Sequence, residues 1–175
     1  MNLSHRITAW ILPVIVVVCT AVPVVVANAD TLLHPAPTQT PKLLLQEDQV
    51  LNVYYFHGNA RCYSCKRIEE LTNKSINSGY SSQLKQQKVI LNIVNLEQEG
   101  NDHYIDDFQL ITRSVVVAIE QQGGVVAYSR LDRVWDLISQ PEQFTQYIYQ
   151  EIDQLSVTTN SAKIQAHNIE KSTHG

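Results

Sequence analysis

Several common functional signatures are missing from this chain of 175 residues. It contains no phosphate-binding loop, no H-E-x-x-H metal motif and no glycine fingerprint for dinucleotides, so it gives no support to those three kinds of site. Basic residues are also few, since 13 lysines and arginines stand against 17 aspartates and glutamates. This acidic balance argues against general nucleic-acid binding. The length suits one compact domain with appendages.

The first appendage is an apolar N-terminal segment. Residues 1–29 have a basic start at Arg6, an apolar middle and a small-x-small end at Ala27-Asn28-Ala29. This is the layout of a secretory signal peptide, so we expect cleavage after Ala29 and export to the periplasm or another extracytoplasmic space. The alternative is an uncleaved membrane anchor, because the apolar run approaches the roughly 20 residues that span a bilayer. Two prolines interrupt the run and favour cleavage.

Cysteine is scarce as well, with three in the whole chain. Cleavage after residue 29 would remove Cys19 and leave only Cys62 and Cys65. In an oxidising compartment these two have no internal partner but each other.

The remaining sequence divides into a spacer, a domain and a tail. Residues 30–42 are rich in proline and small polar residues, which predicts a semi-extended spacer that would hold the domain off a membrane if the leader stayed uncut. Residues 43–157 are expected to form the domain. Residues 158–175 are polar and aperiodic, and we expect this tail to fray from about Val157.

The domain shows alternating strand and helix signals. Runs of β-branched and aromatic residues predict strands at 49–56, 88–95, 114–120 and 125–131, the last two joined by a glycine turn as a hairpin. Helical periodicity predicts helices at 62–75, closed by a loop around Gly79, and at 101–110. A long third helix follows Ser139, which has capping-box spacing with Glu142. The order βαβ–ββα predicts an α/β fold with a mixed four-stranded sheet and helices on both faces.

The motif Cys62-Tyr63-Ser64-Cys65 opens the first predicted helix, directly after the first strand. A lone C-x-x-C fits a working dithiol, a structural disulfide or part of a metal site. The structural disulfide is disfavoured, because so short a loop removes little chain entropy. The metal alternative would use both thiolates and His57 as ligands for Cu(I) or Zn(II).

The strand, motif and helix together resemble the thioredoxin-like superfamily over about residues 43–155. More narrowly, YYFHGNARCYSCKRIEELT is similar to exported thioredoxin-like proteins described as nitrophenyl compound nitroreductase subunits of the ArsF type. Three positions depart from thioredoxins. Arg113 stands where they have a cis-proline, Phe56 where they bury an acid, and Arg61 where a tryptophan precedes the first cysteine.

The chemistry of the motif predicts separate roles for the two cysteines. A thiolate at a helix N-terminus is stabilised by free backbone N–H groups, so we expect Cys62 to attack a disulfide and the more buried Cys65 to resolve the product. Arg61, Lys66 and His57 would add positive charge beside the thiols. The redox disulfide would need no other cofactor, and a protein redox partner is expected.

Two further residues near the motif have open interpretations. Arg113 could lower the pKa of the thiol or hold an anionic substrate, and it could equally be an exposed loop residue. Trp135 is interpreted as a core residue in preference to a residue at the rim of the site.

Overall fold

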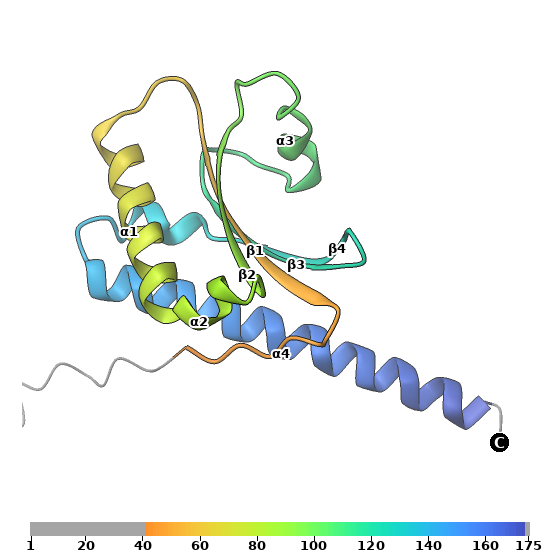
Figure 1. The fold of residues 1–175 in the computed structure, drawn as a ribbon. Coiled ribbons are helices and arrows are strands. Elements are labelled where there is room, and N and C mark those ends of the chain that lie inside the picture. Colours follow the sequence, from red (N-terminus) through yellow and green to blue (C-terminus); the bar gives the residue numbers. More distant parts are fainter. Residues whose placement is uncertain (1–40, 174–175) are drawn as a thin grey trace, which may run out of the picture. The chain divides into compact units, whose positions relative to one another are not determined.

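The computed structural model describes residues 41–173, which lie within one compact unit of the chain. The predicted leader or anchor at 1–29 and most of the spacer lie outside the described residues. Among the described residues, no helix combines the length and apolar character needed to cross a membrane. The elements follow one another as β1 (Gln49–His57), α1 (Tyr63–Gly79), α2 (Ser81–Lys85), β2 (Val89–Asn95), α3 (His103–Asp107), β3 (Val115–Gln121), β4 (Gly124–Arg130), a 3₁₀ turn η2 (Asp132–Trp135) and α4 (Pro141–Thr173) (Figure 1).

The four strands form one mixed sheet in the order β2-β1-β3-β4. β1 runs parallel to β2 and antiparallel to β3, and β3 pairs antiparallel with β4. The central strands are almost wholly buried, which explains why their sequences are continuous apolar runs instead of alternating ones. A βαβ unit followed by a ββα unit, with the C-x-x-C motif at the start of α1, is the thioredoxin-like fold. The predicted fold class is confirmed.

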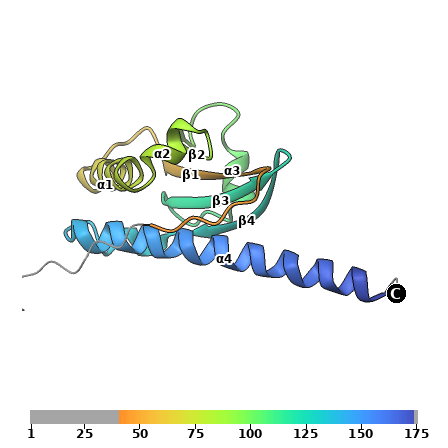
Figure 2. The same ribbon diagram turned by 60° about the horizontal axis from the view of Figure 1, so that its bottom comes forward.

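Helices cover both faces of the sheet, but unequally. α1 and α4 pack together on one face, where Ile68, Phe144 and Ile148 join the larger hydrophobic core. The short α3 lies on the other face, over a smaller cluster that contains Tyr54 and Phe108. Figures 1 and 2 show α3 and α4 on opposite sides of the strands.

The β3–β4 hairpin turns at Gln122 and Gly123, whose φ angles of 53° and 81° are both in the left-handed region. A two-residue turn with both central residues at positive φ matches the twist of an antiparallel pair. A bulge interrupts the pairing near Glu120, where Ile119 pairs with Ala127 but Glu120 pairs with Val125. The predicted hairpin is confirmed.

The helices differ from their predicted lengths. α1 continues through Gly79 to a C-cap at Tyr80, so the expected closing loop is wrong, and the Asn77 side chain donates to the Asn73 carbonyl in place of breaking the helix. α2, which follows at once, was not predicted. The helix expected at 101–110 is reduced to α3, in which Ile105 is exposed.

The long helix begins at Pro141, so Ser139 stands one residue too early to be its N-cap. The C-terminal end of α4 contradicts the fraying expected from about Val157, because the helix continues to Thr173. Thr159 and Ser161 donate hydrogen bonds to carbonyls four residues back, and in this way polar residues fit within the helix. The boundaries proposed for the tail and the domain stay predictions.

Tertiary contacts hold the middle of α4 as well. The Leu44 N–H donates to the Ser156 hydroxyl at 3.3 Å, and the Asn160 side chain donates to the Leu44 carbonyl at 2.8 Å. These two hydrogen bonds therefore hold the extended segment before β1 against α4.

Candidate functional site

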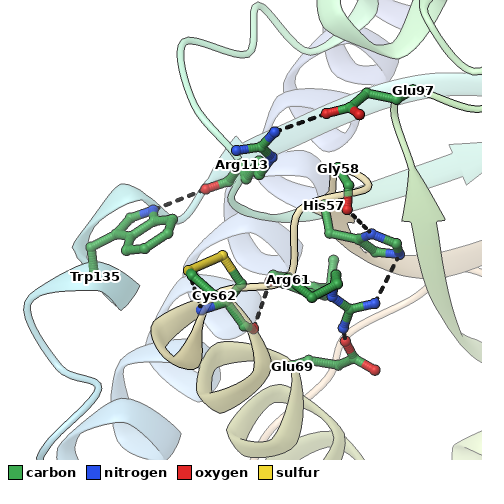
Figure 3. The surroundings of a disulfide bond; sticks show 10 residues. His57, Gly58, Arg61, Cys62, Glu69, Glu97, Arg113 and Trp135 are labelled. Atoms are coloured by element: carbon green, nitrogen blue, oxygen red, sulfur yellow. Dashed lines mark hydrogen bonds and ion pairs between the residues drawn. A yellow bond between two sulfur atoms is a disulfide. The ribbon is translucent and has the colours of Figure 1, made fainter.

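Cys62 and Cys65 form a disulfide at the N-terminus of α1, with Cα atoms 5.1 Å apart (Figure 3). Cys62 is the N-cap of the helix, and its sulfur accepts a hydrogen bond of 3.2 Å from the Cys65 N–H. Cys62 is exposed, whereas Cys65 is only 3% exposed. A partner molecule can therefore reach the first sulfur and not the second.

Tyr55 contacts the backbone of the motif and was missed as a site residue. Its hydroxyl donates a buried hydrogen bond of 2.6 Å to the Cys65 carbonyl. Burial raises the pKa of Tyr55, and the positive charges of Arg61 and Arg113 partly oppose that rise. Phe56, at the position where thioredoxins bury an acid, faces the smaller cluster on the other side of the sheet. Neighbouring residues of a strand point to opposite faces, so Tyr55 and Phe56 are separated by the sheet, but this alternation alone does not show which face holds the motif.

Arg61 and His57 interact away from the sulfurs. Arg61 forms an ion pair with Glu69 on α1, and one of its N–H groups lies 3.5 Å from His57 Nε2. His57 Nδ1 lies 3.0 Å from the Gly58 carbonyl, so a neutral ring that donates there and accepts from Arg61 satisfies both contacts. Glu69 offsets the positive charge of Arg61. The influence of Arg61 and His57 on the thiols stays a prediction.

Arg113, in the segment before β3, pairs with Glu97 in the loop after β2, and Glu97 in turn bonds to the loop before Cys62. Its guanidinium donates to Glu97 at 2.9 Å, and Glu97 also accepts a hydrogen bond of 3.1 Å from the Asn59 N–H. The Asn59 hydrogen bond and then the Arg113 contact lower the pKa of Glu97. A Cβ at Gly58 would lie 2.7 Å from Arg113 Nε, so glycine leaves room for the pair at this point. Arg113 is therefore an ion-paired residue in this structure, with its side chain 40% exposed.

Trp135, in the 3₁₀ turn η2, forms another side of the site (Figure 3). Its indole N–H donates to the Arg113 carbonyl at 2.9 Å, which fixes the ring against the segment before β3. It is partly buried and packs against the larger core, so the core interpretation is only half right. Lys66 is exposed in the first turns of α1.

The structure does not bring together Cys62, Cys65 and His57, the three residues considered as metal ligands. Over residues 41–173, no group of three or more histidine, cysteine or acidic side chains is close enough to hold a metal ion. His57 turns toward Gly58 and Arg61, away from the disulfide (Figure 3). The alternative built on Cys62, Cys65 and His57 therefore lacks its third ligand.

Comparison with known proteins gives only distant structural likeness. No protein-family model and no curated protein matches the chain. Thioredoxin O2 of Arabidopsis thaliana in its oxidised state is 20% identical, with a TM-score of 0.34 over 54% of this chain and 74% of that one. Thioredoxin of Trypanosoma brucei brucei is 16% identical, with a TM-score of 0.33 over 67% of this chain and 99% of that one. Scores this low add nothing to the fold that strand order and pairing already establish.

Proposed function

We propose that this protein is a thiol–disulfide oxidoreductase whose working group is the Cys62–Cys65 pair. The observation that carries the proposal is the difference in exposure between two bonded sulfurs at the start of one helix. Such a pair has one sulfur that meets the partner and one that is shielded until the first step is complete. A disulfide that closes so short a loop stabilises a fold less than one that joins distant segments, so a purely structural role fits poorly.

The proposed reaction uses the two cysteines in turn. In the reduced protein, the Cys62 thiolate attacks one sulfur of a partner disulfide, forming a mixed disulfide and releasing one partner thiolate. Cys65 then loses its proton and attacks the Cys62 sulfur, which re-forms the intramolecular disulfide and releases the second partner thiolate. The two released thiolates each take up a proton from solvent. Two electrons pass to the partner, and the reverse sequence oxidises a partner dithiol.

Three contacts around the motif support this proposal. The Cys65 N–H that now contacts the Cys62 sulfur would stabilise its thiolate, as free N–H groups do at a helix N-terminus. Tyr55 holds the backbone carbonyl of the resolving cysteine. Arg113, through Glu97, steadies the loop that precedes Cys62.

The finer proposal is an exported electron-transfer subunit with a protein redox partner. The leader-like residues 1–29, the proline-rich spacer and the narrower resemblance of YYFHGNARCYSCKRIEELT support it. The disulfide itself would store the electrons, without a further cofactor. A membrane tether would follow if the leader stays attached.

Trapping the mixed disulfide tests the proposal. In a Cys65→Ser variant, Cys62 should form a stable adduct with a disulfide substrate, while Cys62→Ser should form none and lose insulin-reducing activity. Ser64→Ala is the matched control, because it alters the motif without removing a sulfur. Full exchange activity in Cys62→Ser, or adducts formed at Cys65, would overturn the assignment.

A further inference from the structure

The side chain of Tyr55 connects the centre of the sheet to the backbone of the redox motif. Its hydroxyl donates to the Cys65 carbonyl at 2.6 Å, and the whole side chain is 0% exposed. β1 is paired on both sides at this position, with Ile93 of β2 and Val115 of β3. The Tyr55 ring also belongs to the larger hydrophobic core. The hydroxyl is therefore carried by a strand that both of its neighbours hold in place.

This hydrogen bond involves neither sulfur. Two contacts within the motif also hold Cys65 in the oxidised protein, and both depend on the Cys62 sulfur: the disulfide and the hydrogen bond of 3.2 Å from the Cys65 N–H. When Cys62 is bonded to a partner in the mixed disulfide, the bond between the two cysteine sulfurs is absent. The Cys65 carbonyl can then keep its contact with Tyr55, because the atoms that form it take no part in the exchange.

Tyr55 is suited to donate a hydrogen bond and not to accept a proton. Burial raises the pKa of its hydroxyl, and the charges of Arg61 and Arg113 oppose that rise without cancelling it. The phenol therefore keeps its proton at neutral pH. Since it cannot take the proton of the Cys65 thiol, any effect of Tyr55 on the reaction comes through the position of the backbone.

We propose that Tyr55 is a positioning residue for the resolving step, in which Cys65 attacks Cys62. This inference rests on the proposed exchange function. By holding the Cys65 carbonyl, Tyr55 restricts the first turn of α1 and keeps the Cys65 sulfur close to the Cys62 sulfur while the partner is attached. A group that is already held near its reacting geometry loses less freedom on the way to the transition state, so the disulfide closes faster.

The step itself needs no further reagent. The Cys65 thiol loses its proton to solvent, and its sulfur then forms a bond to the Cys62 sulfur as the bond between Cys62 and the partner breaks. The partner sulfur leaves with that electron pair as a thiolate and takes up a proton from solvent. Tyr55 keeps its own proton throughout.

Tyr149 provides a matched control on the same helix. Its hydroxyl donates a buried hydrogen bond of 2.8 Å to the Ser75 carbonyl of α1. Tyr149→Phe and Tyr55→Phe therefore remove the same kind of contact, and they should cost similar stability. They differ in place, because Ser75 lies near the other end of α1, away from the motif.

The test follows thiol exchange between the reduced full chain and dithiobis(nitrobenzoic acid) by stopped-flow absorbance. Cys19→Ser is present in every sample, so that only the two motif thiols react. Attack by Cys62 releases one coloured thionitrobenzoate at a rate that rises with reagent concentration. Attack by Cys65 releases the second at a rate that does not depend on that concentration. The two steps are therefore measured separately on one sample.

We expect Tyr55→Phe to slow the second release about threefold to tenfold, which is the net value of one buried hydrogen bond, and to leave the first release unchanged. Tyr149→Phe should change neither rate. A parent-like second release in Tyr55→Phe, or equal slowing in the two variants, would overturn this proposal alone. A parent protein without any concentration-independent release would overturn the proposed exchange function, and this inference with it.

The reduction potential gives a second readout, which a stability loss shared by both variants does not explain. In the oxidised protein the bond between the sulfurs already holds Cys65, so loss of the Tyr55 hydroxyl should slow closure of the disulfide and not its opening. A threefold to tenfold change in this equilibrium makes the potential of Tyr55→Phe about 14–30 mV less negative. Tyr149→Phe should keep the parent potential. An unchanged or more negative potential in Tyr55→Phe would contradict the proposal.

Discussion

Replacing tyrosine by phenylalanine is expected to lower the free energy of unfolding at Tyr55, and to leave it unchanged or raise it at Tyr80. Both side chains are 0% exposed. The Tyr55 hydroxyl donates to the Cys65 carbonyl at 2.6 Å, whereas the Tyr80 hydroxyl has no hydrogen-bond partner among residues 41–173. Burial removes both hydroxyls from water and raises the pKa of both.

The magnitudes follow from these contacts. Tyr55→Phe keeps the ring and removes one buried hydrogen bond, so it should lower the free energy of unfolding by about 1–2 kcal/mol. Tyr80→Phe removes a buried hydroxyl that costs about 1 kcal/mol or more to desolvate, so it should leave stability unchanged or raise it by up to about 1 kcal/mol. The two variants should therefore differ by roughly 2 kcal/mol, or about 4–8 °C in Tm.

Equilibrium unfolding in urea at neutral pH, on the oxidised protein, measures both variants. If the slope of the unfolding free energy against urea concentration is unchanged, the substitution has altered stability alone. The reasoning is refuted if Tyr80→Phe destabilises the protein as much as Tyr55→Phe does. That result would mean that the Tyr80 hydroxyl has a partner in solution, for which the nearby Asp153 carboxylate is the obvious candidate.

Three further substitutions, with Gly123→Ala as a control for the first, test other parts of the structure. Gly79→Ala should destabilise the protein by about 1–2 kcal/mol in urea unfolding, because the added Cβ would collide with the buried Tyr149 ring. This overpacking outweighs the better helix propensity of alanine. Gly123→Ala is the control that separates collision from backbone strain, since Gly123 has open space around it but a positive φ. Glu97→Gln should flatten the acid limb of the stability–pH curve. The pKa of Glu97 is lowered in the folded protein, so its contribution is present above the ordinary value of 4.5 and is lost as pH falls below it; an unchanged acid limb would contradict this. Asn160→Ala should speed amide hydrogen exchange in the segment before β1, since it removes the hydrogen bond to the Leu44 carbonyl. Equal exchange rates in the variant and the parent protein would show that this contact does not hold the segment.

The strands and the motif were predictable from local sequence. Runs such as QVLNVYYF and SVVVAIE are β-branched and bounded by turn residues, and β1 and β3 lie within a residue or two of their predicted ranges. The placement of Cys62 at the N-cap followed from a motif directly between a strand and a helical pattern. Both signals come from neighbours in the chain, so tertiary structure does not alter them.

The partners of the charged residues were not predictable. Arg61 was expected to act on the thiols, and Arg113 was left open between such a role and that of an exposed loop residue. Tertiary structure brings a carboxylate to each, Glu69 to the first and Glu97 to the second. Composition showed that acids were plentiful and could not show where they would lie. Tyr55 was missed for a related reason, since counting back from Cys62 by analogy selected Phe56.

The length of α4 was also underestimated. Polar residues after Val157 lower the helical signal, yet several of them bond to carbonyls of the preceding turn, and Asn160 also bonds to the segment before β1. Side-chain bonds of this kind depend on the helix already being present. A pattern of apolar spacing cannot show them.

The reduction potential of the Cys62–Cys65 disulfide tests the central claim most directly. It is measured on the purified protein by trapping thiols across a series of glutathione and dithiothreitol buffers, with and without added Zn(II). The proposed exchange function predicts a potential between roughly −120 and −270 mV that does not depend on the metal. A potential below about −300 mV, or thiols that bind the metal before they oxidise, would contradict it.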